Sequence, residues 1–140
     1  MVAVGQGIGI DLGSKYSRVG VWQNDRVEIV PSKSGDRFTP TVVAFTEDKV
    51  LIGEPATQQL LQNTQNTIFD FTGRKFSDPE VQAGIKTWPF EVARGPDDKP
   101  LVVVKKFKGK TKSYQPVEIL AMLLSELREV AETHTGKKIL

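Results

Sequence analysis

A short run near the start of the chain restricts the fold more than any other part of the sequence. Residues 8–22 read IGIDLGSKYSRVGVW, and apolar side chains alternate with other residues on both sides of Gly13. Such alternation is typical of β-strands, so the run predicts a buried strand and a second strand, joined by a tight turn. Because glycine adopts a positive φ at no steric cost, we expect the chain to reverse at Gly13.

The predicted turn has the features of an anion-binding loop. A tight turn leaves several backbone N–H groups pointing outward, and the concavity they form suits an anion. Asp11 comes just before the turn, and a carboxylate is compatible with nearby phosphates if a hydrated Mg²⁺ lies between them. The alternative is a plain hairpin with an aspartate at its mouth, because short glycine motifs also occur without phosphate binding. The Walker pattern GxxxxGK[ST] is absent.

Length and composition fit one ordinary globular domain. The chain has 140 residues, 39% of them hydrophobic and 26% charged, which suffices for a single core. Its net charge of +2 is too small to indicate a nucleic-acid partner. The absence of cysteine excludes disulfides and thiolate zinc sites and is compatible with the cytosol. We expect no signal peptide and no membrane partner, because the amino terminus lacks a basic segment and the apolar run at 119–124 is short.

Turn signals divide the rest of the chain into short elements. The alternation of polar and apolar residues predicts a strand at 26–30, and the segments between later turn signals are interpreted as further strands at 42–45, 50–52, 88–92, 101–107 and 111–114. Proline cannot donate to a strand ladder, so Pro89 places the strand at 88–92 at a sheet edge. Prolines in the first turn indicate short helices at 54–62 and 79–85.

The segment from Pro116 to Gly136 has the clearest periodicity. Its leucines and other apolar residues recur at spacings of three and four, which predicts an amphipathic helix ended by the glycine. His134, the single histidine, falls on the apolar side, so we expect it to be packed rather than to act as a ligand or base. Ile139 and Leu140 begin a further apolar segment where a strand is expected, so the chain is expected to be cut short.

Two smaller features have competing interpretations. Lysines gather at 105–112 around one phenylalanine. This run suits nucleic acid or anionic lipid, but we favour lysines that protect an edge hairpin from pairing. Trp88 and Phe90 are expected to belong to the hydrophobic core of a smaller subdomain, which is defined below.

Taken together, the motifs resemble the amino-terminal part of the ATPase domain of the 70-kilodalton heat-shock chaperone family (the DnaK type). The matching segments are residues 8–13, 16–17, 19–21, 35–37, 39–40, 43–45, 51–53, 65–70, 73–76, 88–90, 118–132 and 136–138. The resemblance implies an α/β fold of the actin-like, ribonuclease-H-like type, present in part: the first strands of one lobe and most of the smaller subdomain above it. It also implies a base subdomain at about 7–38 and 116–140 and an upper subdomain at about 39–115.

The resemblance assigns roles to five residues. In the family, the turn that matches Gly13, Ser14, Lys15 and Tyr16 binds the phosphates of ATP and ADP through backbone N–H and hydroxyl groups. Asp11 matches the aspartate that helps to hold Mg²⁺, partly through water. No residue of this chain is assigned a catalytic role.

The sequence departs from the family pattern in three ways. Ser14 and Lys15 stand where the family has threonines, and Lys15 is either a cation for the phosphates or a solvated turn residue. Only Phe71-Thr72 separates Asp70 from Gly73, so the family's catalytic lysine has no match. Arg74 and Lys75 match the basic turn that follows and do not replace it. The second phosphate loop, the adenosine pocket and the peptide-binding domain have no counterpart in these residues.

Three hypotheses follow. The first is a truncated or divergent heat-shock-70-type chaperone that binds ATP or ADP with Mg²⁺ weakly or not at all and hydrolyses ATP poorly. The second is a working ATPase component of a longer chaperone in which Lys15 replaces the missing lysine. The third is a non-enzymatic module that binds chaperone partners such as nucleotide-exchange factors. All three imply protein folding under stress and a cytoplasmic location, with the nucleus as the alternative. Unfolded clients are expected only if a substrate domain exists elsewhere, and apolar strand edges left without neighbours predict aggregation.

Overall fold

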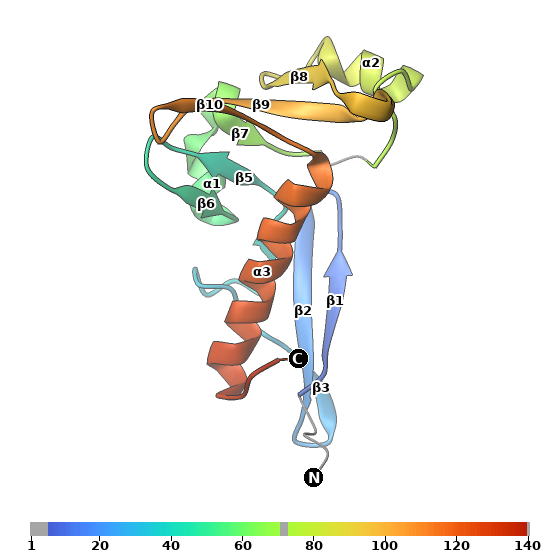
Figure 1. The fold of residues 1–140 in the computed structure, drawn as a ribbon. Coiled ribbons are helices and arrows are strands. Elements are labelled where there is room, and N and C mark those ends of the chain that lie inside the picture. Colours follow the sequence, from blue (N-terminus) through green and yellow to red (C-terminus); the bar gives the residue numbers. More distant parts are fainter. Residues whose placement is uncertain (1–5, 71–72, 140) are drawn as a thin grey trace.

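The computed structural model describes residues 6–70 and 73–139. Three antiparallel sheets and one long helix make up most of the molecule (Figure 1). The first sheet is an antiparallel meander of the three strands predicted within residues 8–30. It consists of β1 (Ile8–Leu12), β2 (Tyr16–Gln23) and β3 (Arg26–Ile29), with the short β4 (Thr39–Pro40) paired to β2. Alternate residues of β2 are buried, as the spacing of its apolar side chains predicts. The expectation that β1 is buried is wrong, because none of its residues is fully buried and Ile10 and Leu12 are exposed.

Two smaller sheets form the upper part of the molecule in Figure 1. One places β5 (Val43–Phe45) between β6 (Val50–Ile52) and β7 (Thr67–Ile68). The other places β9 (Pro100–Phe107) between β8 (Glu91–Arg94) and β10 (Lys110–Tyr114). The lysine-rich run therefore lies on a hairpin whose second strand is a sheet edge.

The predicted strand at 88–92 is placed wrongly, although β8 does lie at a sheet edge. The strand begins only at Glu91, and residues 88–90 precede it as a bend. Trp88 stacks on Phe90, with ring centroids 5.3 Å apart. Pro89 between them removes a donor, so ring packing rather than strand pairing orders this segment. Phe90 is buried and Trp88 packs against the core, as expected.

The helices begin where prolines and caps predict. In α2 (Pro79–Ile85), the Asp78 side chain accepts a hydrogen bond of 2.9 Å from the Glu80 N–H, which is the usual N-cap contact. α1 (Glu54–Thr57) is shorter than the predicted helix at 54–62 and continues as a 3₁₀ turn over 58–60. Further 3₁₀ turns span 64–66 and 96–98. Tightening of a short helix end into 3₁₀ geometry is common because few backbone bonds hold it.

The long helix α3 (Pro116–Thr135) ends at Gly136, which adopts the left-handed conformation with φ 67°. Its buried residues are Ile119, Leu123, Leu127, Val130 and Ala131. They share one core with Val19 and Val21 of β2. α3 thus runs along the first sheet and reaches the upper sheets (Figure 1).

The expectation that His134 is packed is wrong, because its side chain is exposed. The buried stripe of α3 ends at Val130 and Ala131, and the last turn extends past it into solvent.

The pKa of Glu28 on β3 is lowered, chiefly by hydrogen bonds from Asn24 and Arg26 and to a smaller extent by the charges of Arg26 and His134.

Candidate functional site

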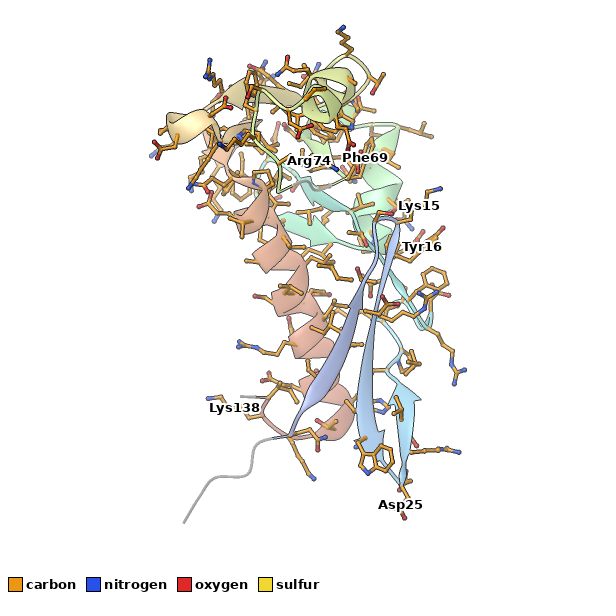
Figure 2. The ribbon with its side chains drawn as sticks, turned by 90° about the vertical axis from the view of Figure 1, so that its right-hand side faces the viewer. Lys15, Tyr16, Asp25, Phe69, Arg74 and Lys138 are labelled. Atoms are coloured by element: carbon orange, nitrogen blue, oxygen red, sulfur yellow. The ribbon has the colours of Figure 1, made fainter. Side chains whose placement is uncertain are left out.

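The turn between β1 and β2 brings Gly13, Ser14, Lys15 and Tyr16 together at the end of the hairpin nearest the upper sheets (Figure 2). Contrary to expectation, Gly13 does not adopt a positive φ. A Cβ atom at this position would instead meet the carbonyl oxygen of Tyr16 at 2.2 Å. Glycine is therefore required by the close approach of the two strands and not by the backbone conformation.

Thr41 holds this turn in place, although sequence reasoning gave it no role. Its hydroxyl donates a hydrogen bond of 2.8 Å to the Gly13 carbonyl, and its N–H donates one of 2.9 Å to the Lys15 carbonyl. The same hydroxyl lies 2.9 Å from the hydroxyl of Ser17, which is completely buried. In the sequence, Thr41 is marked only by its position just after Pro40. Its role becomes visible once β4 pairs with β2, because Pro40 then lies opposite Tyr16.

These bonds orient the turn. A trans peptide unit is planar, so its carbonyl and its N–H point in opposite directions. Because the Gly13 carbonyl points toward Thr41, the N–H of Ser14 points away from it. Ser14, Lys15 and Tyr16 are all exposed. The turn therefore presents an amide, hydroxyl groups and one cation at the surface.

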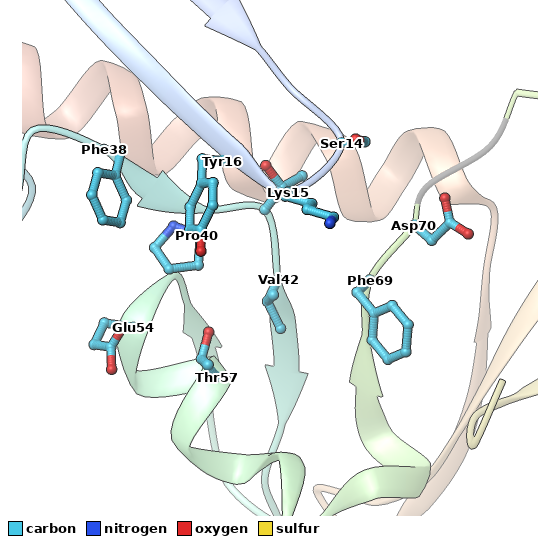
Figure 3. Close-up of a pocket in the computed structure, with 11 residues that line it drawn as sticks. Ser14, Lys15, Tyr16, Phe38, Pro40, Val42, Glu54, Thr57, Phe69 and Asp70 are labelled. Atoms are coloured by element: carbon cyan, nitrogen blue, oxygen red, sulfur yellow. The ribbon is translucent and has the colours of Figure 1, made fainter.

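Residues 14–16 form one wall of a hollow of about 630 Å³ (Figure 3). The volume lies within the usual range for small-molecule sites, roughly 300–1,000 Å³. Its lining is mostly apolar and includes Phe38, Pro40, Val42 and Phe69. Tyr16 packs edge-on against Phe38, with ring centroids 4.7 Å apart.

Polar groups lie at separate points around the hollow. Lys15 and Asp70 both line it, and the Lys15 side chain extends toward the segment that carries Phe69 and Asp70 (Figure 3). Glu54 and Thr57 of α1 line the opposite part. Among the described residues that line the hollow, Lys15 is the single cation.

The structure places Asp11 outside this hollow. Its carboxylate lies on β1 opposite Arg18 of β2, and the closest oxygen and nitrogen atoms are 3.5 Å apart. Both side chains are exposed and border a second shallow hollow on the sheet. The structure thus brings together Ser14, Lys15 and Tyr16, and leaves Asp11 beside a guanidinium group.

The fit of this region to a magnesium nucleotide is partial. A carboxylate is a suitable oxygen ligand for Mg²⁺, which usually keeps several waters and needs only one or two protein carboxylates. Asp11 meets that requirement, but a cation there has to compete with Arg18. In the described ranges, 6–70 and 73–139, no group of three or more histidine, cysteine, aspartate or glutamate residues forms a metal cage. In the same ranges no helix is long and apolar enough to cross a membrane.

The stretch in which the family's catalytic lysine is expected is occupied here by Phe71 and Thr72, which lie outside the described residues. Arg74, just beyond them, forms ion pairs with Asp78 at 3.5 Å and Glu80 at 3.0 Å. It is therefore bound to the start of α2.

Comparisons with known proteins decide the family. The family described as Hsp70 protein matches residues 7–140. The chain belongs to the Hsp70 family. Relatives in this family include heat shock cognate 70 kDa protein 3 of Dictyostelium discoideum, 52% identical over 136 residues, and a heat shock 70 kDa protein of Neurospora crassa, 50% identical over 133 residues. A heat shock 70 kDa protein of Ajellomyces capsulatus is 47% identical over 132 residues.

The Hsp70 relatives are much longer than this chain. The three matches cover 94%, 92% and 92% of the chain but only 21%, 20% and 18% of the respective relatives. The chain therefore corresponds to about a fifth of an Hsp70 protein. Its mixed α/β architecture with several antiparallel sheets is consistent with part of the actin-like ATPase fold, as the motifs predicted. The division into a base and an upper subdomain stays a prediction.

Proposed function

We propose that the chain is a divergent Hsp70-type segment whose first phosphate loop, Ser14 to Tyr16, binds ATP or ADP with Mg²⁺ weakly. Membership of the Hsp70 family supports the ligand class. The observation that carries the proposal is the turn fixed by Thr41, with its outward Ser14 amide and with Lys15 beside the hollow. A preorganised amide and a nearby cation favour an anion at this point.

The roles of the residues follow from their chemistry. Ser14 offers an amide and a hydroxyl to a phosphate oxygen, and Lys15 offers a positive charge. Because all three turn residues are exposed, water weakens the attraction between these charges, which is why the binding is expected to be weak. Mg²⁺, when bound, neutralises phosphate charge, and Asp11 would hold it through water once Arg18 moves aside.

We infer that ATP hydrolysis by these residues is impaired. Phosphoryl transfer depends on positioning and on neutralising charge around the transferred group. Within the hollow's described lining, Lys15 provides the positive charge from one side only. A single loop does not clamp a triphosphate from both sides, so binding and turnover are both expected to be weak.

The first experiment is calorimetric titration of the purified 140-residue chain with ATP and ADP, with and without Mg²⁺, and with circular dichroism on the same sample. We expect weak, saturable binding that requires Mg²⁺ and that Asp11→Ala abolishes. Asp36→Ala is the matched control, because Asp36 is an exposed loop carboxylate that is not among the residues lining the hollow. Folded protein without any binding would reject the phosphate-loop proposal and favour a non-enzymatic module that binds chaperone partners.

A second candidate function is a working ATPase component in which Lys15 supplies the missing charge. The observation that favours it is the position of Lys15, whose side chain extends toward Phe69 and Asp70 (Figure 3). Lys15→Thr restores the family residue and separates the two functions. If Lys15 is catalytic, phosphate release in single-turnover assays falls by at least tenfold. If Lys15 only attracts the phosphates, nucleotide binding weakens in the variant while the rate of phosphate release from bound ATP is unchanged. Tighter binding in the variant would show that Lys15 crowds the loop and would contradict its role in both functions.

Partners and location are proposed from the family alone. We propose nucleotide-exchange factors as protein partners and the cytoplasm as the compartment, with the nucleus as the alternative. Client proteins require a substrate domain outside these residues. Co-sedimentation with a purified exchange factor and imaging of the tagged chain test the two proposals separately.

A further inference from the structure

Strand β10 has an open edge in the upper part of the molecule (Figure 1). It pairs with β9 on one side, and among the described residues no strand pairs with its other side. Within the same ranges, no backbone hydrogen bond of the turns and loops involves residues 110–114. Residues 110–113 are all exposed. The edge therefore offers free N–H and C=O groups to an added strand.

The hairpin of β9 and β10 contains a bulge, but the bulge does not disturb the edge. Phe107 lies opposite Lys110, and Val104 lies opposite Lys112. Two residues of β9 therefore face one residue of β10, so the extra residue belongs to the inner strand. A bulge on the outer strand would turn the edge away from a partner. Here β10 continues without an inserted residue and stays suitable for pairing.

Positive charge is concentrated on this hairpin. Five of the residues at 105–112 are lysine and none is acidic, whereas the net charge of the whole chain is only +2. Lys105 pairs with Glu91 at 2.8 Å. Among the residues that the structure describes, no carboxylate forms an ion pair with Lys110 or Lys112. Their charges are thus available to a partner.

The two lysines of β10 share one face of the sheet. Side chains directly opposite each other share a face, and Phe107 and Val104, which lie opposite Lys110 and Lys112, are both buried. The lysines therefore lie on the core side of the sheet but beyond the margin of the core, where they are exposed. A partner strand with acidic residues at alternate positions would place one carboxylate beside each lysine.

We propose that β10 binds an extended acidic segment of a protein partner, which adds to the sheet as a further strand. Backbone hydrogen bonds to the β10 edge hold the segment, and its alternate carboxylates face Lys110 and Lys112. Opposite charges on neighbouring strands stabilise a sheet, whereas like charges destabilise it. The lysines therefore reject basic strands and a second copy of β10. The binding needs neither nucleotide nor the phosphate loop, so its test is independent of the proposed function.

Two other classes of anionic partner fit the hairpin less well. Single-stranded nucleic acid stacks its bases on exposed aromatic rings, but Phe107 is buried and Tyr114 stacks on Phe45. A flat membrane contacts one face, but Lys105 lies on the face opposite that of Lys110 and is ion-paired there. The exposed residues of β10 are lysine, threonine and serine, which supply no apolar anchor for a bilayer.

Fluorescence anisotropy tests the proposal with the 140-residue chain and a short labelled peptide of alternating glutamate and valine. The wild type is expected to bind the peptide. The double variant Lys110→Glu with Lys112→Glu is expected to bind it at least roughly tenfold more weakly, because attraction between the strands becomes repulsion. Lys86→Glu with Lys99→Glu is the matched control. It changes the net charge equally at exposed positions outside the hairpin and should bind almost as the wild type does.

Circular dichroism confirms that each double variant folds. Absence of peptide binding to the folded wild type would overturn the proposal. An equal loss of binding in both double variants would also overturn it, because net charge and not the β10 edge would then explain the attraction.

The same peptide methylated at every backbone nitrogen separates strand addition from plain charge attraction. It keeps its carboxylates but has no backbone N–H to donate, so we expect its binding to be lost. Amide hydrogen exchange on the wild type locates the unmodified peptide, which should protect amides of β10. Equal binding of the methylated peptide, or protection confined to other segments, would overturn the proposal. Tighter binding of a single-stranded oligonucleotide or of phosphatidylserine vesicles, lost in the variant of Lys110 and Lys112, would overturn it in favour of that partner.

Discussion

At the residue scale, the phosphate turn depends on one buried threonine and one glycine. Thr41 is 3% exposed and contacts Gly13, Lys15 and Ser17. Buried hydroxyls are normally satisfied by hydrogen bonds, and here that requirement also fixes the conformation of the turn. The geometry of the candidate anion site is thus determined by a residue that does not belong to the turn.

Replacement of Thr41 by valine tests this dependence. Valine keeps the shape but leaves the buried Ser17 hydroxyl and the Gly13 carbonyl without this partner. We expect the free energy of unfolding to fall by about 1–3 kcal/mol, measured by urea denaturation. Thr111→Val on the exposed strand β10 is the control and should change stability little. An unchanged stability of Thr41→Val would show that water replaces the hydroxyl.

Gly13→Ala tests the close approach of the two strands. The added Cβ would meet the Tyr16 carbonyl oxygen at 2.2 Å, so the turn has to open. Such overpacking costs about 1–3 kcal/mol, and any Mg²⁺-dependent ATP binding should be lost in calorimetric titration. Gly9→Ala is the matched control, since no atom lies within 4 Å of the added Cβ there. Wild-type stability and binding in Gly13→Ala would contradict the structural account of the turn.

At the element scale, a lysine joins the loop after β3 to the long helix. Lys33 forms ion pairs with Glu126 at 3.1 Å and Glu129 at 3.5 Å. Partial burial alone would lower the pKa of Lys33, but the hydrogen bond to Glu126 and the charges of both glutamates outweigh it and raise that pKa. The loop between β3 and β4 is therefore anchored to the side of α3.

The pH dependence of this anchor has a definite sign. A raised pKa in the folded state means that the ion pairs stabilise the fold below the ordinary lysine pKa of about 10.4 and that this stability is lost as pH rises through the raised value. Because Lys33 is half-exposed, we expect Lys33→Met to lower the free energy of unfolding by about 0.2–1 kcal/mol at pH 8.

Urea denaturation across pH checks this expectation. The difference between wild type and Lys33→Met should vanish at alkaline pH above the raised pKa. Lys49→Met, at an exposed position in the turn between β5 and β6, is the control and should show no such trend. A difference that stays constant across the alkaline range would mean that the Lys33 side chain acts through packing and not through its charge.

At the scale of the whole molecule, Phe45 joins the two upper sheets. It is fully buried on β5 and contacts Phe107 of β9 and Tyr114 of β10, at ring-centroid distances of 5.4 and 5.1 Å. The same core contains the buried residues of α3 and β2. One continuous core therefore links all three sheets, and we expect the described part of the chain to unfold in a single transition.

Phe45→Ala tests the shared core. Loss of a buried phenylalanine costs about 3–5 kcal/mol, a large share of the roughly 5–15 kcal/mol that stabilise a typical domain. Trp22 lies on β2 of the first sheet, and Trp88 lies just before β8 of an upper sheet. The fluorescence of both tryptophans should report the same lowered midpoint of unfolding. Leu61→Ala is the control, because Leu61 is 96% exposed. Separate transitions for the two tryptophans would show that the upper sheets unfold independently.

The sequence by itself determined the local elements and the family. Alternating residues predicted β1 to β3, the spacing of apolar residues predicted α3, and the capping residues Asp78 and Gly136 lie where their chemistry requires. The order of short motifs identified the family. These features depend on neighbours in the chain, and a linear pattern records such neighbours directly.

Only the tertiary structure decided how distant residues meet. Pairing of β4 with β2 brings Thr41 to the turn, and no linear spacing encodes that contact. Close approach of Tyr16, rather than a positive φ, explains Gly13. His134 is exposed because α3 extends beyond its buried stripe, and Asp11 lies beside Arg18 because of strand register. The periodicity of the sequence determines which face of an element is apolar. Tertiary packing determines how much of that face is buried.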